Sequence, residues 1–200
     1  VAEHARTMRD EVMTGLAAAG VHVHPLEDVN ERSRRKLDDY FESQVFPILT
    51  PLAVDAGHPF PFLGNLRLNL MVVFEEPGGA KVPQAYAFVE VPSVLQRLVP
   101  VKGMGEGHHF VLLEDLVRSR MDLLFPGLRI RHVVAFRVTR NQDYDLHEHE
   151  VMDLLKSVEA QLKDRSNKIA VRLEMESGAP KKIVKLLRDQ LGVEDRFVFD

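Results

Sequence analysis

Residues 46–70 read FPILTPLAVDAGHPFPFLGNLRLNL, and this stretch decides the fold. It holds four prolines, at positions 47, 51, 59 and 61. Each proline fixes its own φ, removes a hydrogen-bond donor and biases the preceding residue away from the helix. We expect so rigid and apolar a passage to have another surface packed on it. It runs directly into a strand of period two, whose alternating side chains predict one deeply buried face: Leu66, Leu68, Leu70, Val72 and Phe74.

The rest of the chain alternates between helical and strand patterns. Helices are predicted over residues 2–19, 31–46, 92–98, 114–125, 148–165 and 180–191. Strands are predicted over residues 21–24, 66–74, 85–91, 109–113, 129–139, 168–174 and 196–199. In the strand at 168–174, we expect Ile169, Val171 and Leu173 to face one way. This order predicts an α+β fold, with a mixed, largely antiparallel sheet and packed helices. The strand order does not follow from the sequence.

Composition excludes several classes of protein. The chain is 45% apolar and can bury a core, and its net charge of −4 gives no overall attraction to nucleic acid or to anionic membranes. It contains no cysteine, which excludes disulfides and cysteine-based metal or redox sites. A reducing cytoplasm is the simplest location for such a chain. No window approaches the ~20 apolar residues of a membrane span.

Several segments carry a family resemblance. They are FPILTPLAVD, HPFPF and NLRLNL within residues 46–70, then FRVTRN at 136–141 and VRLEM at 171–175. Their order and spacing resemble the head (middle) domain of the first, histidine-phosphorylating family of bacterial polyphosphate kinases. The resemblance covers essentially the whole chain. It departs from the family at Gly64, where we expect a serine before Asn65.

The resemblance implies a domain organisation and an activity. Residues 1–20 would be the last helix of an N-terminal helical domain, and residues 21–200 the head domain. The parent enzyme would be an ATP-polyphosphate phosphotransferase that reversibly transfers the terminal phosphate of ATP to polyphosphate. It would use Mg²⁺ and a phosphohistidine carried by two later domains. The family uses the head domain in dimer contacts, so we expect the parent to form a homo-oligomer. We also expect the head domain to contact the remaining domains of the parent.

The resemblance also implies that this fragment is inactive alone. We expect no catalytic, cofactor-binding or metal-binding residue in it, and neither ATP nor Mg²⁺ bound by the fragment itself. The candidate interface anchors are the aromatic side chains of the proline-rich passage, Phe46, Phe60 and Phe62, because rigid apolar groups lose little entropy on binding. The simpler interpretation is that these three side chains belong to the core.

Basic residues offer a second function. Arg129, Arg131 and Arg137 share parity along one predicted strand, so we expect them on one face, where they could contact polyphosphate. In that case, the chain would be a stand-alone module that binds polyphosphate or phosphate metabolites. A basic set on the last helix could also meet a polyanion, although a solvated charged face is the simpler interpretation: Lys181, Lys182, Lys185 and Arg188.

Histidine is the remaining candidate for chemistry, with nine copies. His22 and His24 share a face of a predicted strand, and His108 and His109 are adjacent, but no spacing matches a specific metal signature. His147 and His149 form a similar pair. His58 lies within the proline-rich passage, where we expect it to fix the loop by a hydrogen bond. Asp55 is the local carboxylate that could receive that bond.

Overall fold

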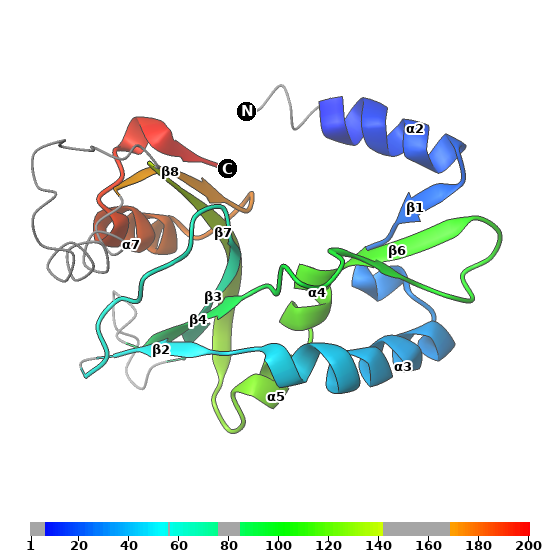
Figure 1. Cartoon of the computed structure of the whole chain (residues 1–200), viewed down its shortest axis with the longest axis horizontal. Coiled ribbons are helices and arrows are strands. Elements are labelled where there is room, and N and C mark those ends of the chain that lie inside the picture. The colour runs from blue at the N-terminus through cyan, green and yellow to red at the C-terminus, as the bar shows by residue number, and fades with distance from the viewer. Residues whose placement is uncertain (1–6, 56, 76–84, 142–168) are drawn as a thin grey trace, which may run out of the picture.

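The computed structural model describes residues 7–55, 57–75, 85–141 and 169–200. Its strands form two sheets (Figure 1), one with the strand order β2-β4-β3-β7-β8-β9 and one with the order β1-β6-β5. Every pairing is antiparallel except β1 with β6 and β8 with β9. The predicted α+β class with a mixed, largely antiparallel sheet is therefore confirmed.

The elements have the following bounds. The larger sheet contains β2 (Leu52–Val54), β3 (Leu68–Phe74), β4 (Tyr86–Glu90), β7 (Ile130–Arg140), β8 (Ala170–Met175) and β9 (Val198–Phe199). The smaller sheet contains β1 (Val21–Val23), β5 (Leu98–Pro100) and β6 (His108–Leu112). The helices are η1 (Met8–Val12), α2 (Met13–Ala18), α3 (Glu31–Tyr40), α4 (Leu113–Arg118), α5 (Met121–Leu124) and α7 (Lys181–Leu191). Single helical turns are η2 (Leu26–Asp28), η3 (Phe41–Val45), η4 (Phe46–Ile48) and η5 (Asp195–Phe197).

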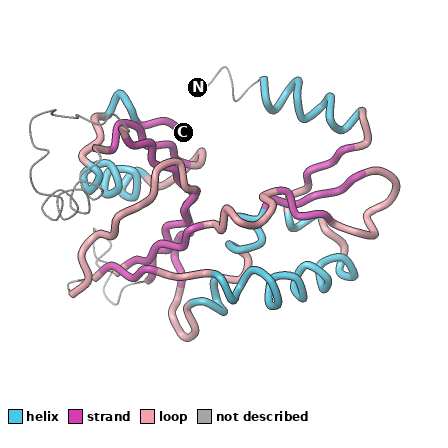
Figure 2. Tube along the Cα trace, viewed as in Figure 1, coloured by secondary structure: helices cyan, strands magenta, loops and turns pink. Residues whose placement is uncertain are grey.

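Helix α3 begins as its sequence predicts, and helical turns continue two residues past the predicted end at residue 46. The Asn30 side chain accepts a hydrogen bond from the Ser33 backbone N–H at 2.9 Å, which satisfies one free donor of the first turn. The helix continues through η3, and its apolar face buries Leu37, Phe41 and Val45. Pro47 lies within the single turn η4, after which the chain becomes extended at Leu49. Helix α3 therefore delivers the proline-rich passage to the edge of the larger sheet at β2 (Figure 2).

Strand β3 lies between β4 and β7 and is buried on both faces. Leu70 and Val72 face one core cluster, together with α3 and α4, while Met71 and Val73 face a second cluster that α7 covers. The prediction of a single buried face is therefore wrong. A strand with a neighbour on each side and helices over both faces presents no face to water.

Two helix predictions need correction. Residues 92–97 form turns instead of a helix, because the chain that follows joins the smaller sheet, where Leu98 pairs with Leu112. The helix predicted over 114–125 is broken into α4 and α5. The Ser119 hydroxyl donates to the Leu116 carbonyl at 2.8 Å, a local bond that competes with the helical ladder. The helix predicted over 148–165 lies outside the described residues.

A bulge corrects the prediction for β8. Thr139 pairs with Arg172 but Arg140 pairs with Ala170, so Val171 has no partner across the ladder. An unpaired residue shifts the alternation of side chains by one position. Ile169 and Val171 are therefore 72% and 40% exposed, whereas Leu173 is fully buried. The prediction that these three side chains face one way is wrong.

The second core cluster depends on Phe88, which is 1% exposed. Its ring centroid lies 5.2 Å from that of Phe60 and 5.6 Å from those of Tyr86 and Phe136. Substitution Phe88→Ala should lower the free energy of unfolding by about 3–5 kcal/mol, because it leaves a cavity among these rings. Val171→Ala, at an exposed position, should cost less than about 1 kcal/mol. Denaturant unfolding measures both, and equal losses would contradict this account of the core.

Candidate functional site

Arg140 joins the proline-rich passage to the end of β7. Its backbone N–H donates to the Asn65 side chain at 2.8 Å, and its guanidinium Nε–H donates to the Leu63 carbonyl, also at 2.8 Å. The guanidinium carbon lies 4.5 Å from the centre of the Phe62 ring. Burial lowers the pKa of Arg140, because the passage removes water from its charge. Residues that lie 75 positions or more apart in the sequence therefore form one unit.

Leu66 closes this unit in an unusual backbone conformation. Its N–H donates to the Val138 carbonyl at 2.8 Å, while its φ is +58°, the left-handed region that costs a non-glycine residue energy. The Leu66 side chain is 56% exposed. The bond to β7 holds a strained residue with its apolar side chain toward solvent, at the rim of a cleft.

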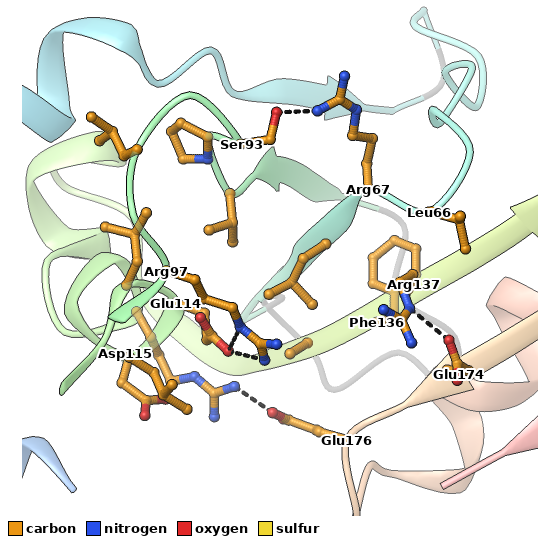
Figure 3. Close-up of a pocket in the computed structure, with 18 of the residues that line it drawn as sticks. Leu66, Arg67, Ser93, Arg97, Glu114, Asp115, Phe136, Arg137, Glu174 and Glu176 are labelled. Atoms are coloured by element: carbon orange, nitrogen blue, oxygen red, sulfur yellow. Dashed lines mark hydrogen bonds and ion pairs between the residues drawn. The ribbon is translucent and has the colours of Figure 1, made fainter. Parts of the chain in front are cut away.

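The cleft has a volume of about 640 Å³ and lies between the larger sheet and α4 (Figure 3). Its lining comes from the passage, from β3, β7 and β8, and from α4 with the loop before β5. Apolar side chains such as Leu68 and Ala135 line part of it, and charged side chains line the remainder. These elements are far apart in the sequence, so only the folded sheet creates the cleft.

Four arginines line the cleft, and each is held by a partner. The Arg97 Nε–H donates to Glu114 Oε1 at 2.9 Å, and the Arg137 Nε–H donates to Glu174 Oε2 at 2.6 Å. Arg118 pairs with Glu176, and Arg67 with the hydroxyl of Ser93. Hydrogen bonding lowers the pKa of Glu174, chiefly through Arg137, and raises that of Arg97 through Glu114. The pairs orient the guanidinium groups and largely cancel their charge.

Glu114 is the most buried charged side chain of the cleft. The residue is only 5% exposed, and its Oε2 has no hydrogen-bond partner among the described residues. The neighbouring Asp115 has a raised pKa, first because it is buried and then because Glu114, Glu176 and Glu27 lie near it. Arg118 opposes that rise. The α4 end of the cleft therefore combines Glu114, Asp115 and Glu176 with Arg97 and Arg118. It leaves one buried acceptor, Glu114 Oε2, and one buried donor, Arg118 Nε, without a partner among the described residues.

The sequence analysis missed this group. A signal was present, because the residues 110–117 read FVLLEDLV and place two carboxylates inside an apolar run. A charged side chain in such a run is seldom fully buried unless it is paired. The hydrogen-bond partner of Glu114 is Arg97, which lies in the loop before β5. Nothing in the local sequence of Arg97 distinguishes it from a surface arginine.

The predicted polyphosphate trio is not one cluster. Arg129 pairs with Glu75 and Arg137 with Glu174, and eight residues of strand separate them by about 26 Å. Val73 pairs with His132 but Phe74 with Ile130, so a bulge at Arg131 shifts the alternation. The expectation that all three share a face is therefore wrong.

The other basic set lies on α7. Lys181, Lys182 and Lys185 are exposed, while Arg188 pairs with Asp189 and Asp195. This is the arrangement of a solvated charged face, and no contact in the described residues points to a polyanion.

The three aromatic candidates lie in different surroundings. Phe60 packs against the second core cluster through Phe88. Phe46 is 40% exposed and Phe62 is 51% exposed. Exposed apolar side chains next to Phe46, at Ile48 and Leu52, extend the surface of the passage. Phe46 and Phe62 therefore remain accessible to a partner, whereas Phe60 contributes to the core.

Three histidines stack between β1 and β6. The ring centroid of His109 lies 5.0 Å from that of His22 and 5.1 Å from that of His24. His109 Nε2 donates to the Glu106 carbonyl at 2.9 Å, so its Nδ1 accepts from His24 Nε2 at 2.8 Å. Because the three rings are nearly parallel, their nitrogen atoms do not point toward one position at which a metal ion could be bound. Within the described residues, no three His, Cys, Asp or Glu side chains are placed to hold a metal ion.

His58 fixes the loop as predicted. Asp55 Oδ1 lies 2.9 Å from His58 Nδ1 and also accepts from the backbone N–H of Gly57 at 2.7 Å. These bonds, led by the one with the His58 side chain, lower the pKa of Asp55. The pair closes a turn of the proline-rich passage. His147 and His149 lie outside the described residues.

The fold and the cleft define a two-sheet α+β domain with an ion-paired surface cleft. The family of the polyphosphate kinase middle domain matches residues 32–200, and the chain belongs to this family. The described part of the chain contains no helix that is both long and apolar enough to cross a membrane.

Named relatives agree with this assignment. The polyphosphate kinase of Mycobacterium ulcerans is 40% identical over 199 residues, which cover 95% of this chain and 26% of the relative. That of Bacillus anthracis is 36% identical over 200 residues, covering 96% of this chain and 28% of the relative. The chain thus spans about a quarter of the length of these relatives.

A solved structure has the same fold. The crystal structure of polyphosphate kinase from Porphyromonas gingivalis superposes with a TM-score of 0.74 at 19% identity, covering 98% of this chain and 27% of that one. At this identity, the likeness concerns the fold.

Removal of Arg97 should expose the cost of the buried Glu114. Arg97→Ala removes both donors of Glu114 Oε1, so that neither oxygen of the buried carboxylate keeps a partner among the described residues, and it should lower the free energy of unfolding by about 1–3 kcal/mol. The matched control is Arg129→Ala, whose ion pair with Glu75 is largely exposed and should contribute less than about 1 kcal/mol. Thermal or denaturant unfolding measures both variants, and equal effects would contradict the burial argument.

The histidine stack should make stability depend on pH. Burial, then the neighbouring His109 and His22, lower the pKa of His24 below its ordinary 6.5. Just below pH 6.5, the unfolded chain therefore binds more protons than the folded chain. The contribution of His24 to the free energy of unfolding is fully present above that pH and is lost as the pH falls through it. Thermal unfolding between pH 7.5 and 5.5 should show this fall, and His24→Gln should make it shallower. An unchanged slope in the variant would exclude His24 as the cause.

Proposed function

We propose that this chain is the head domain of a polyphosphate kinase that reversibly transfers the terminal phosphate of ATP to inorganic polyphosphate. The observation that carries the proposal is the family match over residues 32–200, in a chain that spans about a quarter of relatives named polyphosphate kinase. The catalytic phosphohistidine, ATP and Mg²⁺ would be held by other parts of the parent, which would act in the cytoplasm. The head domain would be inactive alone.

The proposal includes a domain division after residue 20. The first helical segment, over residues 7–18, buries no side chain in α2 and leaves Met8, Val12 and Leu16 exposed. An apolar stripe of this kind on a helix is suited to packing against other helices. Residue 21 begins β1, which pairs with β6. These features support the assignment of residues 1–20 to a preceding helical domain and of residues 21–200 to the head domain.

The head domain would support dimer assembly and the shape of the active site. The exposed Phe46 and Phe62 in the rigid passage support this role, because ordered aromatic side chains are typical anchors of protein interfaces. Arg140 immobilises Phe62, so little further conformational freedom is lost on association.

A polyphosphate-binding module remains the second candidate. Two observations favour the head-domain role over it: Arg129, Arg131 and Arg137 do not share one face, and Arg129 and Arg137 are held in ion pairs. The two candidates predict different outcomes for the isolated chain, because only the second requires it to bind polyphosphate at low salt.

The deciding experiment compares the full-length parent with the 200-residue chain. The parent should synthesise polyphosphate from ATP in the presence of Mg²⁺, and the isolated chain should not. Filter binding with polyphosphate at low salt then tests the second candidate. A parent gene that encodes no further domain, or a full-length protein without this synthesis, would overturn the proposed function.

Phe62 provides a specific test of the interface role. In the full-length parent, Phe62→Ser should weaken self-association by about tenfold or more and lower polyphosphate synthesis, because the removal of an interface anchor typically costs about 2 kcal/mol or more. Leu128→Ser is the matched control, since Leu128 is 54% exposed and lies outside the passage. Analytical ultracentrifugation gives the association constant. Wild-type association and activity in Phe62→Ser would exclude this residue from the interface.

A further inference from the structure

A short strand pairing attaches the first helical segment to the rest of the domain. β1 pairs with β6 in parallel over its three residues (Figure 1). The His108 N–H donates to the Gly20 carbonyl at 2.7 Å, and the His24 N–H donates to the Phe110 carbonyl at 2.8 Å. Helix α2, which precedes β1, buries no side chain. The attachment of residues 7–20 therefore rests largely on this pairing.

The histidine stack lies across the same pairing. His22 and His24 belong to β1 and His109 to β6, and the three ring centroids lie 5.0 to 6.0 Å from one another. The Glu106 carbonyl can only accept, so His109 Nε2 donates to it. The bond from His24 Nε2 then uses the Nδ1 lone pair of a neutral His109. The observed arrangement therefore requires His109 to be uncharged.

Like charges meet in the stack once its rings are protonated. Burial, then His109 and His22, lower the pKa of His24, and the carboxylate of Asp28 in η2 opposes them. Helix α2 carries no titratable side chain, and His108 points to the opposite face of β6 from His109. Among the described groups that act on His24, one carboxylate therefore faces as many as two further imidazolium charges. Their repulsion is relieved when β1 moves away from β6.

Two glycines bring the backbones together where this pairing begins. A Cβ atom at Gly107 would lie 2.6 Å from the carbonyl oxygen of Gly20, and the φ of Gly107 is +97°. An alanine at this position would separate the two strands without changing any histidine. Gly107 therefore offers a way to open the pairing that does not depend on pH.

We propose that the histidine stack is a pH-sensitive switch, which holds residues 7–20 on the domain while its rings are neutral and releases them when the rings are protonated. Release separates β1 from β6. The larger sheet stays folded, because none of the three histidines belongs to its strands. In the parent, the switch changes how the preceding helical domain meets the head domain. This last consequence rests on the proposed function.

Hydrogen exchange in the full-length parent tests the switch, with rates corrected for the intrinsic effect of pH. Between pH 7.5 and 5.5, the protection of residues 21–24 should fall about tenfold or more, because one additional proton bound on opening shifts the equilibrium by up to about tenfold per pH unit. Residues 68–74 and 130–140, which form β3 and β7, should keep their protection.

Matched variants assign the effect to the stack. The double variant His22→Gln with His24→Gln should keep residues 21–24 protected at both pH values. His58→Gln, which changes a histidine in the proline-rich passage, should respond to pH as the wild type does. Gly107→Ala should lose the protection of residues 21–24 at both pH values, because it opens the pairing sterically.

Each contrary result overturns the switch. These results are unchanged protection of residues 21–24 in the wild type at pH 5.5, an equal loss in β3 and β7, and an undiminished loss in the double variant. If the double variant is unprotected already at pH 7.5, His22→Phe keeps a planar ring that does not titrate. It should then lose less protection than the wild type at pH 5.5, and an equal loss overturns the switch. Polyphosphate synthesis by the wild-type preparation is a separate readout: its absence rejects the proposed function, whereas exchange alone decides the switch.

Discussion

The antiparallel pairing of β3 with β7 is the constraint on which the rest of the structure depends. β3 is covered on both faces, so its backbone groups can be satisfied only by its two neighbouring strands. That pairing separates one core cluster, under α3 and α4, from the other, under α7. The same pairing places Arg140, at the end of β7, beside the proline-rich passage that precedes β3.

Arg140 explains why two distant motifs occur together. A guanidinium presents several donors in a fixed fork, so one side chain can bind a carbonyl and lie over an aromatic ring at once. Here it binds the Leu63 carbonyl and lies over Phe62, while its own N–H is taken by Asn65. The rigid prolines restrict the passage before these contacts form. The passage and the end of β7 therefore act as one surface, with Phe62 exposed and Leu66 at the rim of the cleft.

The ion pairs of the cleft serve orientation more than stability. Partly exposed pairs such as Arg137 with Glu174 contribute little net free energy, because solvent screens them and two long side chains lose freedom. Glu114 differs, because the folded chain removes it from water and satisfies only one of its oxygens. A buried carboxylate of this kind depends on its donor, Arg97, more than a solvent-exposed carboxylate depends on its own. This difference distinguishes the α4 end of the cleft from the surface pairs elsewhere on the molecule.

Local physics explains what the sequence by itself determined. The cap at Asn30, the strands at 68–74 and 130–140 and the helix ending at Gly192 follow from backbone preferences and from apolar periodicity. The resemblance of the passage and of FRVTRN to polyphosphate kinases was also present in the sequence, and the family match agrees with it. Tertiary structure alone decided the bulges at Arg131 and Val171, the burial of both faces of β3, and the cleft around Glu114. These features depend on strand register and on contacts between segments that are distant in the sequence. A local pattern of residues does not specify which strand will pair with a given edge, or which arginine will contact a given side chain.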